Sequence, residues 1–562
     1  MVVPSLLWAL GACAADETSS GAGGTSSGGT SSGGTSSGGG GAGGAATGRC
    51  PSGLAPDPDV AQALPQSSVD TSYVAPLGAT IPVAAGGDFQ AALDAAQPGD
   101  VITLEAGATF QGPFTLPAKA GSDTIVVRTS AGDDALPAPG QRVDPSFAAV
   151  MPKIVVAANI GSALVTATGA HHYRFIGVEI APTAGSFVYT LVAFGNGETT
   201  EADLPHHLII DRCYLHGDPA AGSRRGVGLN SKHSAVIDSY LADFKENGGD
   251  SQAIAGWNGS GPFKIVNNHL EGAAENIMFG GADPSVPNLV PSDIEICGNH
   301  IVKPTAWRDA GWSAKNLFEL KNARRVLLAG NVLENSWANA QVGFAIVLTP
   351  RNQDGTAPWC TIEDLTIAYN VIRHSGSGIA MAGEDDLHPS QQQQRVVIRD
   401  NLLDDVNRDA WGGDGRLFQV TSPSRPTVDV KVDHNTATMA GNAFLVAGDT
   451  GVVGQGFRFT NNIVPHGDYG AFGSGQGEGN SAFAFYFPGI VCQKNVLLGS
   501  TAASYPADNF FPSTMADVGF VDLAGGNLAL DAGSPYRAAG TDGKDVGADW
   551  AGLQAATIGA AP

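Results

Sequence analysis

Short apolar runs recur along most of this chain, and each is interrupted by a polar residue at the same place. In "RRVLLAGNVLENS" Asn331 separates two apolar triplets, and the arrangement returns in "FKIVNNHLEG", "IEICGNHIVK" and "LTIAYNVIRH". The apolar runs are short and rich in β-branched residues, which predicts strands. The aligned residues are eight asparagines spaced 27 to 39 residues apart: Asn268, Asn299, Asn331, Asn370, Asn401, Asn435, Asn462 and Asn495.

A second apolar run precedes each asparagine, as in "ENIMFGG", "GFAIVLT" and "NAFLVAG". A constant local pattern with variable spacing is typical of a solenoid in which the strands are fixed and the connecting loops vary in length. Two or three strands per coil, each pairing with its equivalent in the next coil, predict parallel sheets. We interpret the asparagines as corners of this solenoid, because Asn tolerates the left-handed conformation of a tight bend and stacked amides can hydrogen-bond from coil to coil.

On these residues the chain resembles the right-handed parallel β-helix proteins of the pectin lyase-like superfamily, over about residues 84 to 549. The opening "GGDFQAALDAAQPGDVITLEAGATFQG" is similar to the start of many such proteins. Phe89, Leu93 and Ala96 share one face of a short predicted helix after Asp88, which suits a cap over the open end of the solenoid. The expected fold class is therefore all-β, a right-handed parallel β-helix with an N-terminal capping helix and a disordered N-terminal tether.

The first residues indicate a targeting signal and not a part of the fold. Residues 1–13 contain "VVPSLLWALGAC", which resembles a bacterial lipobox with Cys13 as the lipidated residue, and an ordinary cleaved signal peptide is the alternative. Residues 14–50 are Ser/Gly/Thr-rich and predict a flexible linker. The expected organisation continues with the capped β-helix at 51–549 and a tail at 550–562. We expect an exported protein that is lipid-anchored at the bacterial cell envelope or extracellular surface.

Composition limits the partners. The chain has 562 residues, of which 43% are hydrophobic and 15% charged, and its net charge is -24. This charge argues against nucleic acid and anionic membrane as partners, so that any membrane contact would come through the lipid anchor alone. A monomer is expected. The cysteines after Cys13 are scattered without C-x-x-C spacing, which predicts buried small hydrophobes rather than a zinc site or a dense disulfide framework.

Polar residues are densest between 223 and 353, and this segment holds the candidate chemistry. In "NLFELKN" and "AIVLTPR" strand alternation points the apolar residues inward and points Glu319, Lys321 and Arg351 outward. β-Elimination on a uronic acid removes the proton next to the carboxylate, so an enzyme must neutralise that carboxylate and supply a base and an acid. An acidic polysaccharide is therefore the expected substrate of an enzyme built on this face.

The order "FELKNARR" followed one coil later by "LTPRNQ" is similar to the chondroitinase B and alginate lyase family of polysaccharide lyases. The resemblance implies that Lys321 is the base and Arg351 the acid. It also implies a Ca²⁺ site formed by Glu319 with Glu275 or Asp283. The chain departs from the family in lacking its Arg-His-Gly motif, and surface ion pairs of Lys321 and Arg351 are the alternative to catalytic roles.

Further candidates for substrate binding surround these residues in the same segment. A tryptophan can stack on a sugar ring, and arginines can meet a uronate carboxylate, although loop anchoring and solvated charges are the alternatives. The candidates are Arg224, Arg225, Gln252, Trp257 and Asn258.

Two other functions stay open at this point. A glycoside hydrolase on the same fold needs two carboxylates roughly 5 to 10 Å apart, which Asp250, Glu275 and Asp283 could supply. A non-catalytic solenoid that binds glycans or acts as an adhesin needs no such constellation. Unsaturated uronate products would identify a lyase, new reducing ends alone would identify a hydrolase, and a binding protein would give neither.

Overall fold

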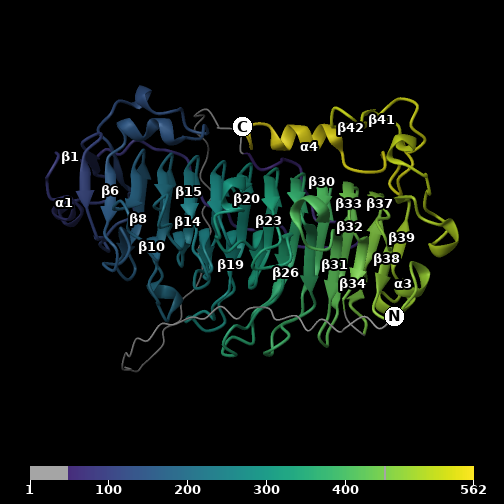
Figure 1. The fold of residues 1–562 in the computed structure, drawn as a ribbon. Helices are drawn as coiled ribbons and strands as arrows, with labels where there is room; N and C mark the ends of the chain where they lie inside the picture. The colour runs from purple at the N-terminus through teal and green to yellow at the C-terminus, as the bar shows by residue number, and fades with distance from the viewer. Residues whose placement is uncertain (1–48, 449–450) are drawn as a thin grey trace. The chain divides into compact units, whose positions relative to one another are not determined.

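The computed structural model describes residues 49–448 and 451–562 of the chain. Cys13 and nearly all of the predicted linker lie outside the described residues, so the lipidation and tether predictions stay predictions. No helix in the described part is long and apolar enough to cross a membrane. Residues 49–562 form one compact unit, built from stacked strands (Figure 1).

Three long parallel sheets make up this unit, and each coil contributes a strand to each of them along most of the solenoid. The first sheet has 15 strands: β1 (Thr80–Val83), β2 (Val101–Leu104), β5 (Ile125–Thr129), β8 (His171–Ile176), β11 (His206–Asp211), β14 (Lys232–Ile237), β17 (Phe263–Val266), β20 (Ser292–Cys297), β23 (Ala323–Ala329), β26 (Ile362–Ala368), β29 (Gln394–Arg399), β32 (Thr427–Asp433), β35 (Gly454–Gln455), β36 (Arg458–Thr460) and β39 (Val491–Gln493). The second has 13: β3 (Thr109–Gln111), β6 (Lys153–Val156), β9 (Glu179–Pro182), β12 (Tyr214–His216), β15 (Tyr240–Phe244), β18 (His269–Gly272), β21 (His300–Val302), β24 (Val332–Ser336), β27 (Val371–Ser375), β30 (Leu402–Asn407), β33 (Thr436–Ala440), β37 (Ile463–Pro465) and β40 (Val496–Leu498).

The third sheet carries the candidate site. It has 12 strands: β4 (Phe114–Leu116), β7 (Leu164–Thr166), β10 (Thr190–Phe194), β13 (Arg225–Leu229), β16 (Gln252–Gly256), β19 (Glu275–Phe279), β22 (Asn316–Leu320), β25 (Phe344–Leu348), β28 (Ser377–Ala382), β31 (Arg416–Thr421), β34 (Ala443–Ala447) and β38 (Ala471–Gly473). This architecture confirms the parallel β-helix predicted from the sequence.

Apolar side chains stacked in register fill the inside of the solenoid. Ile277, Phe318 and Ile346 pair across β19, β22 and β25, and all three are fully buried in the main core cluster. Phe318 and Leu320 point inward as predicted from the alternation in "NLFELKN". Burial of successive apolar rows is the main favourable contribution to folding.

The asparagine ladder is confirmed and lies at the turn between the 15-stranded and 13-stranded sheets. At Asn331, Oδ1 accepts the backbone N–H of Asn299 at 3.0 Å, and Nδ2 donates to Ile296 O at 2.9 Å and to Asn370 Oδ1 at 3.0 Å. The same pattern repeats from Asn268 to Asn495. Each amide therefore satisfies backbone groups of its neighbours in the buried turn.

The prediction that the ladder asparagines themselves adopt the left-handed conformation is wrong. Positive φ angles occur instead at the residue immediately before each one, as at Asn267 (φ 58°), Asp400 (φ 54°) and Lys494 (φ 58°). The bend falls one residue earlier because the asparagine must direct its amide into the stack. Gly298 and Gly330 occupy the same bend position without the steric cost of a Cβ.

Short helices and irregular segments cover the ends and one side of the unit. Helix α1 (Phe89–Ala95) begins after Asp88, whose side chain accepts the N–H of Ala91, and buries Phe89 and Leu93 as predicted for a cap. The remaining α-helices of the described residues are α2 (Arg408–Trp411), α3 (Asn480–Tyr486) and α4 (Trp550–Thr557). The hairpin of β41 (Phe520–Asp522) and β42 (Asn527–Leu530) packs with α4 in a second apolar cluster.

The segment before β1 lies along the 15-stranded sheet. Gln62 Nε2 donates to Thr366 Oγ1 at 3.1 Å, and the Gln66 N–H donates to Asp293 Oδ1 at 2.9 Å. A disulfide joins Cys50 to Cys297, so the prediction of small hydrophobic packing is wrong for these two cysteines. Cys213, Cys360 and Cys492 are free and buried, which confirms the prediction of small hydrophobic packing for these three.

Candidate active site

A continuous polar row crosses the outward face of the 12-stranded sheet. Arg225, Gln252, Glu275 and Asn316 pair in register on β13, β16, β19 and β22. Arg225 Nε donates to Gln252 Oε1 at 3.1 Å, and Gln252 Nε2 donates to Glu275 Oε2 at 2.7 Å. The parallel register thus connects three of the residues predicted from the sequence into one hydrogen-bonded line.

Glu319 and Lys321 lie beside this row, at the end of β22. Asn316 Nδ2 donates to Glu319 Oε2 at 2.9 Å, and Lys321 Nζ lies 3.5 Å from Glu319 Oε1. Leu317 and Phe318 are both buried in the core, so the strand alternation breaks there. This irregularity places Asn316 and Glu319 on the same outward side, although they are three residues apart.

Lys315 is a site residue that sequence reasoning missed. Its ammonium pairs with Asp250 and lies 3.5 Å from Glu275 Oε1. Asn316 was missed as well, because strict alternation from Glu319 assigns it to the wrong face. The signal available in the sequence was their position in the polar stretch "WSAKNLFELKN".

Glu275 is the most perturbed acid of this group. Its side chain is fully buried, with 0% exposure. Burial raises the pKa of Glu275 to about 7, the nearby Asp250 and Glu319 charges act in the same direction, and Lys315 and Lys321 oppose the shift. Near neutral pH Glu275 therefore exchanges its proton readily, a property that suits an acid or base.

The raised pKa gives a prediction for stability. A carboxyl group that is protonated in the folded state up to about pH 7 but only to about pH 4.3 when unfolded binds more protons in the folded state between these values. The contribution of Glu275 to the free energy of unfolding therefore falls as the pH rises through this window and is constant above it. We compare the free energy of unfolding of Glu275→Gln with that of wild type by urea unfolding at pH 4 and at pH 8. The difference, variant minus wild type, should be about 1–3 kcal/mol more favourable to the variant at pH 8 than at pH 4.

The control is Glu201→Gln, which changes an exposed carboxylate. An equal free-energy difference between Glu275→Gln and wild type at both pH values would contradict the raised pKa.

Arg225 has an environment that differs from that of its neighbour Arg224. The Arg225 guanidinium lies over the rings of Trp257 and Tyr189, at 4.9 and 5.4 Å from their centroids. Within residues 49–448 and 451–562 it makes no ion pair with a carboxylate, and burial lowers its pKa. Arg224, in contrast, pairs with Glu246, with Nη2 at 2.8 Å from Oε1. Arg225 is therefore the one of these two arginines whose guanidinium is not paired with a carboxylate among the described residues.

Trp257 and Asn258 differ in what they can offer a ligand. Both backbone N–H groups donate to Asn230 Oδ1. The Asn258 amide is fully used, because Nδ2 donates to Glu198 O at 2.8 Å and Oδ1 accepts the Val286 N–H at 3.0 Å. The structure thus gives Asn258 a loop-anchoring position and leaves Trp257 stacked on Arg225.

Arg351 lies on the coil after Lys321, and its backbone N–H donates to Lys321 O at 2.9 Å. Its guanidinium is engaged by two acids, with Nη1 at 2.8 Å from Asp385 Oδ1 and 2.6 Å from Asp386 Oδ1. The two predicted catalytic residues therefore lie on adjacent coils, joined by a backbone hydrogen bond, but Arg351 is paired with two carboxylates.

The oxygen ligands expected for Ca²⁺ are brought together only in part. Asp283 Oδ2 accepts the N–H groups of Asp354 and Thr356 at 3.2 and 2.8 Å, which fixes it in a loop. Among the described residues, Glu275, Asp283 and Glu319 do not form a group of three mutually close acidic ligand atoms. Glu275 Oε1 and Asn316 Oδ1 are, however, buried without a hydrogen-bond partner. Asn316 pairs in register with Glu275, and its Nδ2 donates to Glu319 Oε2, so Asn316 lies next to both acids.

Comparisons with known proteins concern the fold. No protein-family model and no curated protein matches the chain. Among solved structures, it is similar to an alginate lyase from Paenibacillus sp. str. FPU-7, at 14% identity, covering 70% of this chain and 98% of that one with a TM-score of 0.32.

Two further solved structures show a similar degree of likeness. A mannuronic acid specific polysaccharide family 6 lyase from human gut microbiota is 12% identical, with 78% and 83% of the chains covered and a TM-score of 0.40. The Dettilon tailspike protein is 14% identical, with 67% and 62% covered and a TM-score of 0.37. At these identities and TM-scores the likeness concerns the fold and not the chemistry of the site.

Proposed function

We propose that this protein is a polysaccharide lyase that cleaves an acidic, uronic acid-containing polysaccharide by β-elimination on the outward face of the 12-stranded sheet. The observation that carries the proposal is Arg225, a cation without a carboxylate partner among the described residues, in the same polar row as Glu275. In a chain with a net charge of -24, such a group is a specific attraction for an anionic ligand.

The spacing of the cations suits a polymer. Parallel strands lie about 4.8 Å apart, so three strand steps from β13 to β22 separate Arg225 from its register partner Asn316 by about 14 Å, and Lys321 lies further along the same strand direction. Arg225 can hold the carboxylate of one sugar while another sugar reaches Lys321. Trp257 and Tyr189 supply apolar rings at the Arg225 end of this path.

Lys321 is the proposed base. It removes the proton from the carbon that bears the uronate carboxylate, the electron pair forms a carbon–carbon double bond, and the glycosidic C–O bond breaks. The leaving oxygen takes a proton from the newly protonated Lys321 or from Arg351 on the adjacent coil. The second role of Arg351 is to hold the loop of Asp385 and Asp386 beside the site.

Ca²⁺ is proposed as a cofactor, held by Glu275, Asn316 and Glu319. Glu275 Oε1 and Asn316 Oδ1 are buried without a hydrogen bond, which supports this assignment, although Lys315 Nζ lies 3.5 Å from the Glu275 oxygen. When bound, the ion would neutralise the substrate carboxylate. We expect EGTA to raise KM without changing the chain length of the products.

A second candidate function is glycoside hydrolysis. Glu275, with its raised pKa, and Asp250, paired with the same lysine, are two carboxyl groups in different environments. The complete burial of Glu275 weighs against direct contact with a glycosidic oxygen, so the lyase is preferred. A non-catalytic glycan-binding or adhesin-like role is the remaining alternative.

One assay separates these functions. The purified protein is offered a panel of polyuronates while ultraviolet absorbance of unsaturated uronate and release of reducing ends are followed together. A lyase raises both signals, a hydrolase raises reducing ends alone, and a binding protein changes neither. Absence of the absorbance signal on every polyuronate would overturn the proposal.

Export is also proposed, with lipidation of Cys13 as the anchor. The disulfide between Cys50 and Cys297 supports export, because disulfides persist in oxidising compartments. If the anchor is present, Cys13→Ser should move the protein from the membrane fraction to the soluble or secreted fraction, and unchanged membrane association would contradict it.

A further inference from the structure

Five histidines gather at the start of three consecutive strands of the 15-stranded sheet, away from the residues of the candidate active site. They are His171 and His172 at the start of β8, His206 and His207 at the start of β11, and His233 at the second position of β14. His171 pairs in register with His206. The rings of His171 and His206 stack at 4.7 Å, and those of His172 and His207 at 4.3 Å.

The local backbone explains why neighbouring histidines face each other. Adjacent residues of a regular strand point to opposite faces. His172 and His207 have left-handed conformations, with φ of 59° and 55°, which break this alternation. As a result, Nδ1 of His171 lies 2.8 Å from Nδ1 of His172, and the His206 and His207 Nδ1 atoms lie 2.7 Å apart.

Later coils use the same backbone position differently. Asp293 and Arg325 are left-handed there and form an ion pair at 2.7 Å, as do Asp364 and Arg395 at 2.6 Å. Opposite charges thus neutralise each other at this position in the later coils, where the earlier coils place imidazole rings.

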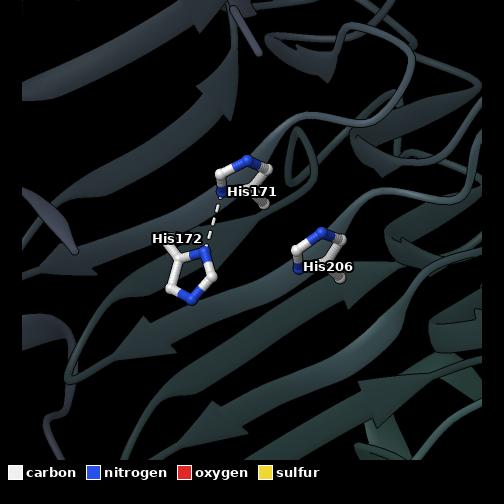
Figure 2. A group of neighbouring side chains, drawn as sticks. All are labelled: His171, His172 and His206. Atoms are coloured by element: carbon white, nitrogen blue, oxygen red, sulfur yellow. Dashed lines mark hydrogen bonds between the residues drawn. The ribbon is translucent and has the colours of Figure 1, made fainter. Parts of the chain in front are cut away.

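We propose that His171, His172 and His206 form a binding site for a divalent transition-metal ion, with Zn²⁺ or Cu²⁺ as the fitting class. One ring nitrogen from each residue lies within 4.8 Å of the other two (Figure 2). Three nitrogens bound tetrahedrally to Zn²⁺ at 2.0–2.1 Å lie about 3.4 Å apart, which small rotations of the rings achieve. The partly exposed rings leave the remaining coordination positions to solvent or to another ligand.

The ligand chemistry separates this site from the proposed calcium site. Imidazole nitrogen suits zinc and copper, whereas Ca²⁺ prefers oxygen ligands. The ion would connect two consecutive coils, because His171 and His172 belong to β8 and His206 belongs to β11. A bound ion is therefore expected to raise the thermal midpoint of the full chain.

The test is a Zn²⁺ titration of the full chain by calorimetry, with metal content measured after gel filtration. We expect one equivalent of tightly bound Zn²⁺ that Ca²⁺ does not displace. Cu²⁺ should bind at the same place and show nitrogen hyperfine splitting from three imidazoles in its electron paramagnetic resonance spectrum. His206→Ala should weaken Zn²⁺ binding more than about 100-fold, since loss of a ligand exceeds the 10–100-fold effect of outer partners.

The matched control is His233→Ala, which removes a ring that stacks on His207 at 4.7 Å but is not one of the three proposed ligands. This variant should still bind one equivalent of Zn²⁺. His171→Ala is the second ligand variant, and the metal-free thermal midpoint of each variant shows whether it is folded. No bound equivalent in wild type, or unchanged Zn²⁺ affinity in the folded His171→Ala and His206→Ala variants, would overturn the site and leave a stack of rings only.

Discussion

Lys321→Arg is expected to lower kcat on the responsive polyuronate about 10²- to 10⁴-fold, the range typical of removing a general base. Arginine keeps the positive charge beside Glu319, whose Oε1 lies 3.5 Å from Lys321 Nζ, but it does not release a proton at neutral pH. The ion pair with Glu319 is thus preserved while the general base is lost. Initial rates of absorbance increase at saturating substrate measure the effect.

The control for this variant is Lys494→Arg, which makes the same change at a lysine paired with Asp508 on a distant coil. Its kcat should equal that of wild type. Both variants should unfold within about 1 kcal/mol of wild type. If Lys321→Arg keeps full turnover, Lys321 is a structural cation and the base has to be sought among the carboxyl groups.

Asn331→Ala is expected to destabilise the protein by about 3–5 kcal/mol, the largest stability effect predicted here. The change removes the acceptor for the Asn299 N–H and the donor to Ile296 O, and it leaves Asn370 Oδ1 without one of its partners. Asn331 is fully buried, so water cannot replace these bonds. Equilibrium unfolding in urea provides the measurement.

Asn480→Ala is the matched control, because this asparagine is exposed at the first position of α3. We expect it to change stability by no more than about 0.5 kcal/mol. A loss below about 1 kcal/mol for Asn331→Ala would mean that the stacked rows of apolar side chains hold the turn without the ladder.

The fold was predictable because its signals are local and repeated. One asparagine per coil marked the turn, and the alternation in "NLFELKN" correctly placed Phe318 and Leu320 inside. The left-handed residue was assigned one position too late, since both Asn267 and Asn268 fit a tight bend by composition. Only the backbone shows which of the two directs its amide into the ladder.

The sequence predicted which sheet face carries the site, but it did not predict which side chains hydrogen-bond to one another there. Gln252 and Glu275 were expected on this face, but their hydrogen bond depends on the register between β16 and β19. Asn316 escaped notice because the strand alternation breaks at Leu317 and Phe318, and Lys315 because it precedes β22. Loop residues such as Asp283 could not be placed from strand periodicity, and the structure puts its carboxylate on the loop of Thr356.

The central claim is that an acidic polysaccharide binds and is cleaved on the outward face of the 12-stranded sheet. A crystal structure of Lys321→Arg with an oligo-uronate of the cleaved polymer tests it most directly. The account predicts a chain of sugars along β13 to β22, with one carboxylate bonded to the Arg225 guanidinium and a uronate proton directed at residue 321. An oligosaccharide bound on another sheet, or one that contacts neither Arg225 nor residue 321, would contradict it.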